Sequence, residues 1–336
     1  MASVPVAATR ELPLTAPPSD VPSYREKFWV SGYDAAAGAG FSIWLETSPG
    51  DYGQWTENLQ VVLPGRLLRS RTVTPRREGA YVGGQHAWGV SREPLAVWDY
   101  QARFEAEAFD IARVPGTPGR RTEVALDLRL TSTAPAQEVI KAADAALEES
   151  TFGTQYRQFF NAAGSVEVDG RRIAFDGPGF RARTTGPVAG GSFGGHAMIS
   201  ARFPSGRGAL MLRQVRPDRS LLVNWAAMLD GDRAEVATII DAPLHLTRVT
   251  PQNERFDVSL SSALGDWTVE VETVAPMLVV DPGYFIEAAR SAEDLARVKD
   301  QAGFANNIAC ARFRLDGETT YGMTERSART NLLDEE

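Results

Sequence analysis

Short segments of alternating hydrophobic and polar residues, divided by tight turn signals, limit this 336-residue chain to few architectures. Within residues 121–130, Val124 and its alternate neighbours share one face of an expected strand, while Glu123 lies on the other. Asp-Gly pairs, which tolerate the positive φ of a two-residue hairpin turn, divide such segments at three positions: 169–170, 230–231 and 316–317. Strands repeated in this way predict a β-sandwich or barrel rather than a parallel sheet with crossover helices.

The rhythm of the sequence divides the chain into two β-rich series. Residues 1–22, rich in Pro, Ala, Ser and Thr, are expected to form a flexible or surface-hugging arm. Barrel or curved-sheet domains are then predicted at 23–134 and 164–336. Residues 135–163, rich in Ala and Glu, are predicted to form a helical connector, and 284–303 a late amphipathic helix. Small barrels can enclose one ligand.

Composition and spacing exclude several function classes. The net charge of −8 argues against a nucleic-acid partner. The chain has neither a secretory signal pattern nor an apolar run of bilayer length, so we expect no integral membrane segment and a cytoplasmic location. A single cysteine, Cys310, rules out an intramolecular disulfide. The three histidines lack metal-ligand spacing and the glycine-rich segments lack a nucleotide-binding motif, so we expect neither a metal nor an organic cofactor.

An aromatic neighbourhood follows residue 80. His86 and Trp88 lie two residues apart and would share one face of a strand. An aromatic cavity can bind an extended apolar ligand and can stabilise developing carbocation charge through cation–π attraction. The competing interpretation is a core packed with aromatic side chains. The predicted substrate-binding side chains are Tyr81, Trp88, Trp98 and Tyr100.

Asp99 is the candidate acid, with His86 as the base. If the face of Asp99 is internal, burial raises its pKa and keeps the carboxyl group protonated, as an acid catalyst for an alkene requires. If that face is external, Asp99 is an ordinary solvated carboxylate. Glu46 and Glu325 pose the same question, and Arg181 is a further candidate.

Four segments together resemble the superfamily of carotenoid 1,2-hydratases and AttH-like proteins. The resemblance implies two lipocalin-like β-barrel domains and chemistry on the C=C bonds of large hydrophobic substrates. The family includes hydratases, terpene-type cyclases and Diels–Alderases, and the implied ligand is an isoprenoid, polyene or steroid-like molecule. The four segments are FWVSGYDAAAGAGFSIWLETSPGDYGQW at 28–55, EPLAVWDYQARFEAEAF at 93–109, QYRQFFNAAGSVEVDGRRIAFDGPGFRAR at 155–183 and YGMTERS at 321–327.

The segment DGPGFRARTTGP departs from the pattern of the family. Many relatives have a loop that reads Gly-x-Gly-x-Arg-Asp-His-Ser-Trp-Gly. Here Arg181 and the glycines fit, whereas Ala182 and Arg183 stand at the Asp and His positions. The acid–base pair that the resemblance implies is therefore absent. Three functions stay open: alkene hydration or cyclisation by protonation, a pericyclic reaction driven by substrate folding, and non-catalytic binding of a lipid or isoprenoid.

Overall fold

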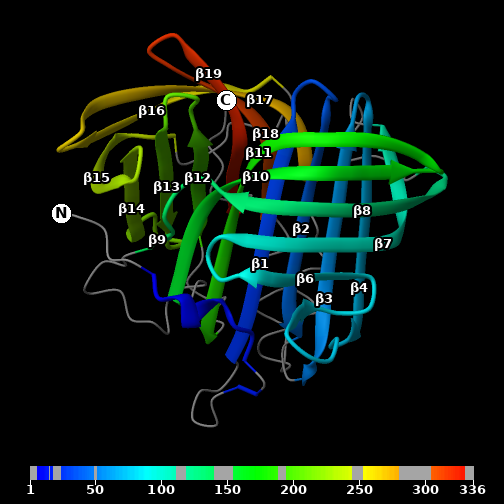
Figure 1. The fold of residues 1–336 in the computed structure, drawn as a ribbon. Coiled ribbons are helices and arrows are strands. Elements are labelled where there is room, and N and C mark those ends of the chain that lie inside the picture. The colour runs from blue at the N-terminus through cyan, green and yellow to red at the C-terminus, as the bar shows by residue number, and fades with distance from the viewer. Residues whose placement is uncertain are drawn as a thin grey trace. The chain divides into compact units, whose positions relative to one another are not determined.

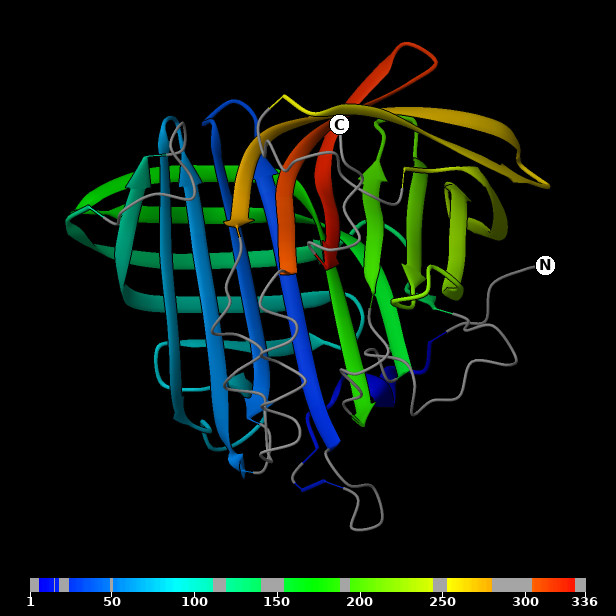
Figure 2. The same cartoon turned by 180° about the vertical axis from the view of Figure 1, so that it is seen from behind.

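The computed structural model contains two compact units, seen from opposite sides in Figure 1 and Figure 2. The N-terminal unit comprises Val4–Glu138 and Thr154–Thr185, and the C-terminal unit comprises Val139–Gly153 and Gly186–Glu336 together with Met1–Ser3. Within the described ranges the regular structure is β-strand, apart from the 3-10 helix η1 (Ala8–Glu11). The structure describes residues 6–14, 16–17, 24–48, 51–110, 119–139, 154–187, 194–243, 253–279 and 304–329.

The N-terminal unit is a strongly curved antiparallel sheet. Its described strands are β1 (Tyr24–Asp34), β2 (Ala39–Ser48), β3 (Asp51–Leu63), β4 (Arg66–Pro75), β5 (Tyr81–Gly83), β6 (Ala87–Glu93), β7 (Val97–Asp110), β8 (Arg121–Ser132), β9 (Gln137–Glu138), β10 (Thr154–Val168) and β11 (Arg171–Pro187). Their order is β4-β3-β2-β1-β11-β10-β8-β7-β6-β5, with β9 beside β10. In Figure 1 the blue strands β1–β4 run across the cyan and green strands β7 and β8, and β4 pairs with β7. The sheet therefore folds over one core, which its inner face supplies.

The C-terminal unit is a closed barrel within its described residues. Its strands are β12 (Gly195–Arg202), β13 (Arg207–Val215), β14 (Leu221–Asp230), β15 (Arg233–Asp241), β16 (Arg255–Ser262), β17 (Gly265–Val279), β18 (Phe304–Leu315) and β19 (Glu318–Arg329). The Asp-Gly pairs at 169–170 and 316–317 form the two-residue turns of their hairpins, as predicted. The third predicted hairpin turns one residue later, at Gly231-Asp232, because Asp230 is still paired with Arg233. Gly231 and Gly317 adopt positive φ values of 60° and 82°, the conformation that glycine tolerates best. The expected fold of two lipocalin-like domains is confirmed.

The boundary between the units differs from the prediction. Residues 154–163, expected in the helical connector, form the first part of β10, which pairs with β8 and β11 in the N-terminal unit. Both faces of this part of β10 are buried, so apolar residues such as Phe159 and Phe160 follow one another and the two-residue alternation is lost. At the start of the expected connector, Gln137–Glu138 form strand β9 beside β10. Residues 140–153 of the connector and the helix expected at 284–303 lie outside the described residues.

The glycines of DGPGF serve backbone packing in β11. A Cβ atom at Gly177 would lie 2.4 Å from Tyr33 O, and one at Gly179 would lie 2.4 Å from Ser31 O and 2.5 Å from a ring carbon of Phe160. Real Cβ atoms do not approach other atoms this closely, so only glycine lets β11 lie against β1 here. The segment is therefore a strand rather than a catalytic loop.

We expect Gly179→Ala to destabilise the protein by about 1–3 kcal/mol, because the added methyl group forces backbone displacement in a packed region. Urea denaturation followed by circular dichroism measures this loss. Gly119→Ala is the matched control, since its Cβ would have Ala108 O as nearest neighbour at 3.3 Å. The control should stay within about 0.5 kcal/mol of wild type. Equal stability of the two variants would contradict the packing argument.

Candidate functional site

The interior of the N-terminal unit contains buried charged side chains. Arg181 Nη2 lies 2.6 Å from Glu11 Oε1, and these side chains are 2% and 1% exposed. Arg183 Nη2 lies 2.6 Å from Glu26 Oε1, with exposed fractions of 5% and 0%. Charged groups are rarely buried unless they are paired. This part of the interior is therefore a polar site rather than the purely apolar chamber that a hydrocarbon substrate would need.

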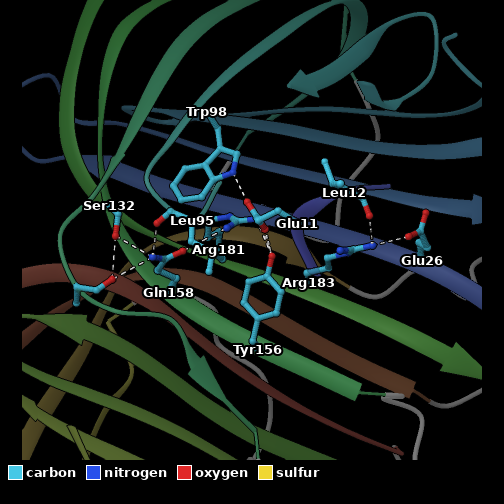
Figure 3. A network of polar contacts seen from close by, with 11 residues as sticks. Glu11, Leu12, Glu26, Leu95, Trp98, Ser132, Tyr156, Gln158, Arg181 and Arg183 are labelled. Carbon is cyan, nitrogen blue, oxygen red and sulfur yellow. Dashed lines mark hydrogen bonds and ion pairs between the residues drawn. The ribbon is translucent and has the colours of Figure 1, made fainter. Parts of the chain in front are cut away.

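Three strands converge on the carboxylate of Glu11, as Figure 3 shows. Tyr156 OH and Trp98 Nε1 both donate hydrogen bonds to it, in addition to Arg181. Arg181 also donates to Gln158 Oε1 at 3.2 Å, and its guanidinium carbon lies 4.0 Å from the centroid of the Trp98 ring. The result is a carboxylate held by one cation and two neutral donors between aromatic rings.

Tyr100 completes the aromatic wall of this site. Burial raises the pKa of Tyr100 to about 12, while the charge of Arg181 acts to lower it and that of Glu11 acts to raise it. The phenol is therefore neutral at physiological pH. It stays a hydrogen-bonding group beside the Arg181–Glu11 pair.

The register of the sheet explains why these side chains meet. Residues two apart share a face, so Trp98 and Tyr100 of β7 both point into the core. On β10 and β11, Gln158 is paired with Arg181 and Tyr156 with Arg183, and cross-strand partners share a face. Sequence reasoning selected Trp98, Tyr100 and Arg181, which the structure brings together, but it missed Glu11, Tyr156 and Gln158. The composition of the arm offered no signal that Glu11 would be buried.

Asp99 lies on the opposite face of β7 and is not a buried acid. Its Oδ2 accepts from Arg92 Nε at 2.6 Å and its Oδ1 accepts from Arg129 Nε at 2.9 Å. The hydrogen bond from Arg129 is the largest cause that holds the pKa of Asp99 below its usual value; burial opposes it and Arg92 adds to it. The proposed role of Asp99 as a protonated acid is therefore wrong, because two arginines favour its ionised form.

We expect Asp99→Asn to lower stability slightly at neutral pH. Because the folded-state pKa is depressed, the contribution of Asp99 to stability is present above its unfolded value, near 3.8, and is lost as the pH falls through the lower folded value. The stability gap between wild type and variant should therefore close in acid. Thermal melts between neutral pH and about pH 3 test this, and a gap that widens in acid would contradict it.

The predicted aromatic wall is split between two faces of the sheet. Trp88 is paired with Gln101, and Tyr81 with Val90, which is in turn paired with Asp99. Tyr81 and Trp88 therefore lie on the outer face with Asp99, away from Trp98 and Tyr100. The guanidinium of Arg77 covers both rings, at 3.9 Å from the Trp88 centroid and 5.0 Å from that of Tyr81. Their cation–π partner is a residue of the protein.

His86 forms a dyad with a fully buried carboxylate. Its Nδ1 lies 3.1 Å from Glu57 Oε2, and the side chains of Glu57 and His86 are 0% and 44% exposed. Glu57 Oε1 accepts from the backbone N–H groups of His86 and Ala87, and Thr72 Oγ1 donates to Glu57 Oε2. A carboxylate only accepts hydrogen bonds, so Nδ1 is the ring nitrogen that donates to Glu57, and Nε2 is the one that faces away from it.

The Glu57–His86 dyad lies near the place where β4 and β7 stop pairing. β4 pairs with β7 only from Arg66 to Arg69, opposite Glu107 to Asp110. Beyond this the strands separate, and a cleft of about 430 Å³ opens between them. His86 and Phe104 line both this cleft and an adjacent one of about 370 Å³. The other residues of the larger cleft are Arg69, Ser70, Arg71, Thr72, Glu105, Glu107 and Arg121.

The remaining candidates have structural partners. Glu46 is buried and lies 3.1 Å from Arg25 Nη1. Glu325, in the C-terminal unit, lies 2.7 Å from His196 Nε2 and accepts from Ser327 Oγ. Cys310 is buried, and burial raises the pKa of its thiol, which disfavours a reactive thiolate. In the part of the chain that the structure describes, no acidic, His and Cys side chains cluster as metal ligands and no helix has the length and hydrophobicity of a membrane span.

Comparison with known proteins identifies structural neighbours of the chain. No protein-family model matches the sequence, and no curated protein matches it either. An AttH-type protein from Nitrosomonas europaea matches over 91% of this chain and 92% of its own, with 15% identity and a TM-score of 0.60. CghA in complex with Sch210972 covers 91% and 89%, with 13% identity and a TM-score of 0.53. Kievitone hydratase from Nectria haematococca covers 90% and 89%, with 10% identity and a TM-score of 0.51. The chain therefore has the two-domain lipocalin-like fold of the AttH-like proteins, as its sequence motifs predict.

Proposed function

We propose that the protein is a cofactor-independent enzyme that adds water to a C=C bond of a hydrophobic small molecule, with the Glu57–His86 dyad as its general base. The observation that carries this proposal is an imidazole fixed through Nδ1 by a buried carboxylate and exposed to a cleft of about 430 Å³. A histidine oriented in this way is suited to proton transfer at neutral pH. Hydratase activity in one structural neighbour supports the reaction class.

The dyad favours base-assisted hydration of a C=C bond conjugated to a carbonyl group. His86 Nε2 takes a proton from water while the water oxygen bonds to the β carbon, and the displaced electron pair moves to the carbonyl oxygen. The imidazolium then returns the proton to the α carbon, which restores the base and completes the addition of one water. Protonation of an isolated alkene is disfavoured, since Asp99 is an ionised outer-face carboxylate.

The arginines of the cleft favour a substrate that carries oxygen atoms. Arg69, Arg71 and Arg121 line the same cleft as His86. A guanidinium near a developing enolate stabilises its negative charge in the transition state. Phe104 supplies an apolar wall for the rest of the substrate. We therefore propose an unsaturated, carbonyl-bearing substrate such as a prenylated phenol or polyketide rather than a pure hydrocarbon.

Incubation with defined substrates tests the proposal. Kievitone, after which one structural neighbour is named, and trans-chalcone, a simple conjugated ketone, are the first compounds to test. Hydration adds the mass of one water, and heavy-oxygen water places the label in the product. Conversion without mass change would instead favour a pericyclic reaction. Tight binding without conversion would favour a carrier.

A further inference from the structure

The N-terminal arm, residues 6–14, is attached to the N-terminal unit through side chains. Among the described residues its backbone–backbone hydrogen bonds stay within the arm, from Arg10 N to Ala7 O and from Leu12 N to Thr9 O. Its links to the sheet include Arg10 Nη1 with Glu138 Oε1 at 2.6 Å, and Glu11 with Arg181 at the same distance. Leu12 is 55% exposed. The arm can therefore leave without breaking any strand pairing of the sheet.

Arg181 and Arg183 have carboxylate partners on different parts of the chain. Arg183 is paired with Glu26 of β1, which belongs to the sheet itself. Arg181, two residues away on β11, is paired with Glu11 of the arm. When the arm leaves, Arg183 keeps its carboxylate and Arg181 loses its own. A buried guanidinium without a counter-charge is costly, so this position attracts another anion.

The groups left behind form a receptor for a carboxylate. Arg181, Tyr156 OH and Trp98 Nε1 all direct donors to the position of the Glu11 carboxylate (Figure 3). Arg181 Nε is buried and, within the described residues, has no hydrogen-bond partner, so a second N–H is present for a two-point contact. Trp98 and Tyr100 also belong to the hydrophobic core. An anion bound here would have apolar surface beside it.

We propose that Arg181, Tyr156 and Trp98 bind the carboxylate of an amphipathic acid, and that Glu11 is the intramolecular competitor for the same donors. Binding of an acid at Arg181 does not require the reaction assigned to His86. The tethered Glu11 occupies the site in the resting protein. The apparent affinity for a free acid is therefore lower than the intrinsic affinity by the fraction of molecules whose arm is open.

Fluorescence titration with cis-parinaric acid, a polyene fatty acid, tests the proposal on the full-length protein. Glu11→Gln keeps the shape of the side chain but removes its charge, so we expect this variant to bind the acid at least about tenfold more tightly than wild type. The methyl ester of the same acid has no anion and should show no such gain. Adding Arg181→Gln to the Glu11→Gln variant should abolish the gain.

Glu138→Gln is the matched control, because it removes an arm contact without changing the charge at Arg181. It should raise affinity by at most about fivefold, as expected for a partly exposed ion pair. A folded Glu11→Gln variant that binds the acid no more tightly than wild type would overturn the proposal, as would equal binding of acid and ester. If Glu11→Gln does not fold, the rate of trypsin cleavage after Arg10 is measured in the wild type, with and without the acid, to show whether the acid displaces the arm. Faster cleavage in the presence of the acid, but not of the ester, supports competition between the acid and Glu11. An unchanged cleavage rate refutes it.

Discussion

Replacement of His86 by glutamine is expected to lower turnover of the hydrated substrate by about 100- to 10,000-fold, the range for loss of a positioned general base. Glutamine retains a donor for Glu57 but has no group that can take a proton at neutral pH. The effect should fall on kcat more than on KM, because the proton is transferred only in the transition state. Steady-state kinetics with the compound that gains water measures it.

The partner carboxylate supplies the matched comparison. Glu57→Gln should lower turnover by about 10- to 100-fold, as is typical when the residue that orients a functional histidine is changed. Asp99→Asn, on the outer face, should retain wild-type kinetics. Circular dichroism melts check that each variant is folded. A folded His86→Gln variant with more than half of the wild-type activity would remove His86 from the mechanism and favour catalysis by substrate folding.

Arg183→Met should destabilise the protein more than Arg181→Met or Asp99→Asn, with a loss of about 3–5 kcal/mol in the free energy of unfolding. The change leaves Glu26 as a buried carboxylate with 0% side-chain exposure on a strand that cannot move into water. Leu14 N still donates to Glu26, but a neutral donor does not replace the charge of Arg183. Urea denaturation at neutral pH measures the loss.

Two further variants separate this explanation from a general loss of packing. Arg181→Met should lower the free energy of unfolding by less than Arg183→Met does, since Glu11 lies on an arm that can move its carboxylate into water. Glu26→Met in the Arg183→Met background should recover most of the stability, because a well-packed apolar pair can replace a buried ion pair. Equal losses for the two arginine variants would contradict the difference between their partners.

The fold could be predicted from local patterns, because the alternation of hydrophobic and polar residues and the Asp-Gly turns can be recognised within short stretches of sequence. Val124 to Leu130 and the turn at 316–317 are of this kind, and both are found as expected. The first part of β10, residues 154–163, was predicted as a helix because it is buried on both faces, a property that depends on its neighbours in the sheet. Contacts with strands far away in the sequence therefore determine the secondary structure of this segment, and its local pattern alone does not.

The candidate site could be predicted only in part, for a similar reason. Trp98 and Tyr100 were selected by residue type and Arg181 by the family resemblance, and cross-strand register brings them together. Glu11 meets Arg181 across 170 positions of the chain, and nothing in the composition of the arm points to this contact. Asp99 was selected from the sequence but does not belong to the site. Its predicted role depended on which face of β7 is internal, and the sequence left both faces open.

The N-terminal unit is assembled from two separate stretches of the chain, and this affects its synthesis. β1 lies beside β11, so the first unit cannot complete its sheet until Thr154–Thr185 has left the ribosome. Until then the edge of β1 exposes unpaired backbone groups, which are open to wrong pairing with other nascent chains. Contacts over such sequence separations also make folding slow. We therefore expect the nascent chain to need protection from aggregation until β11 has been made.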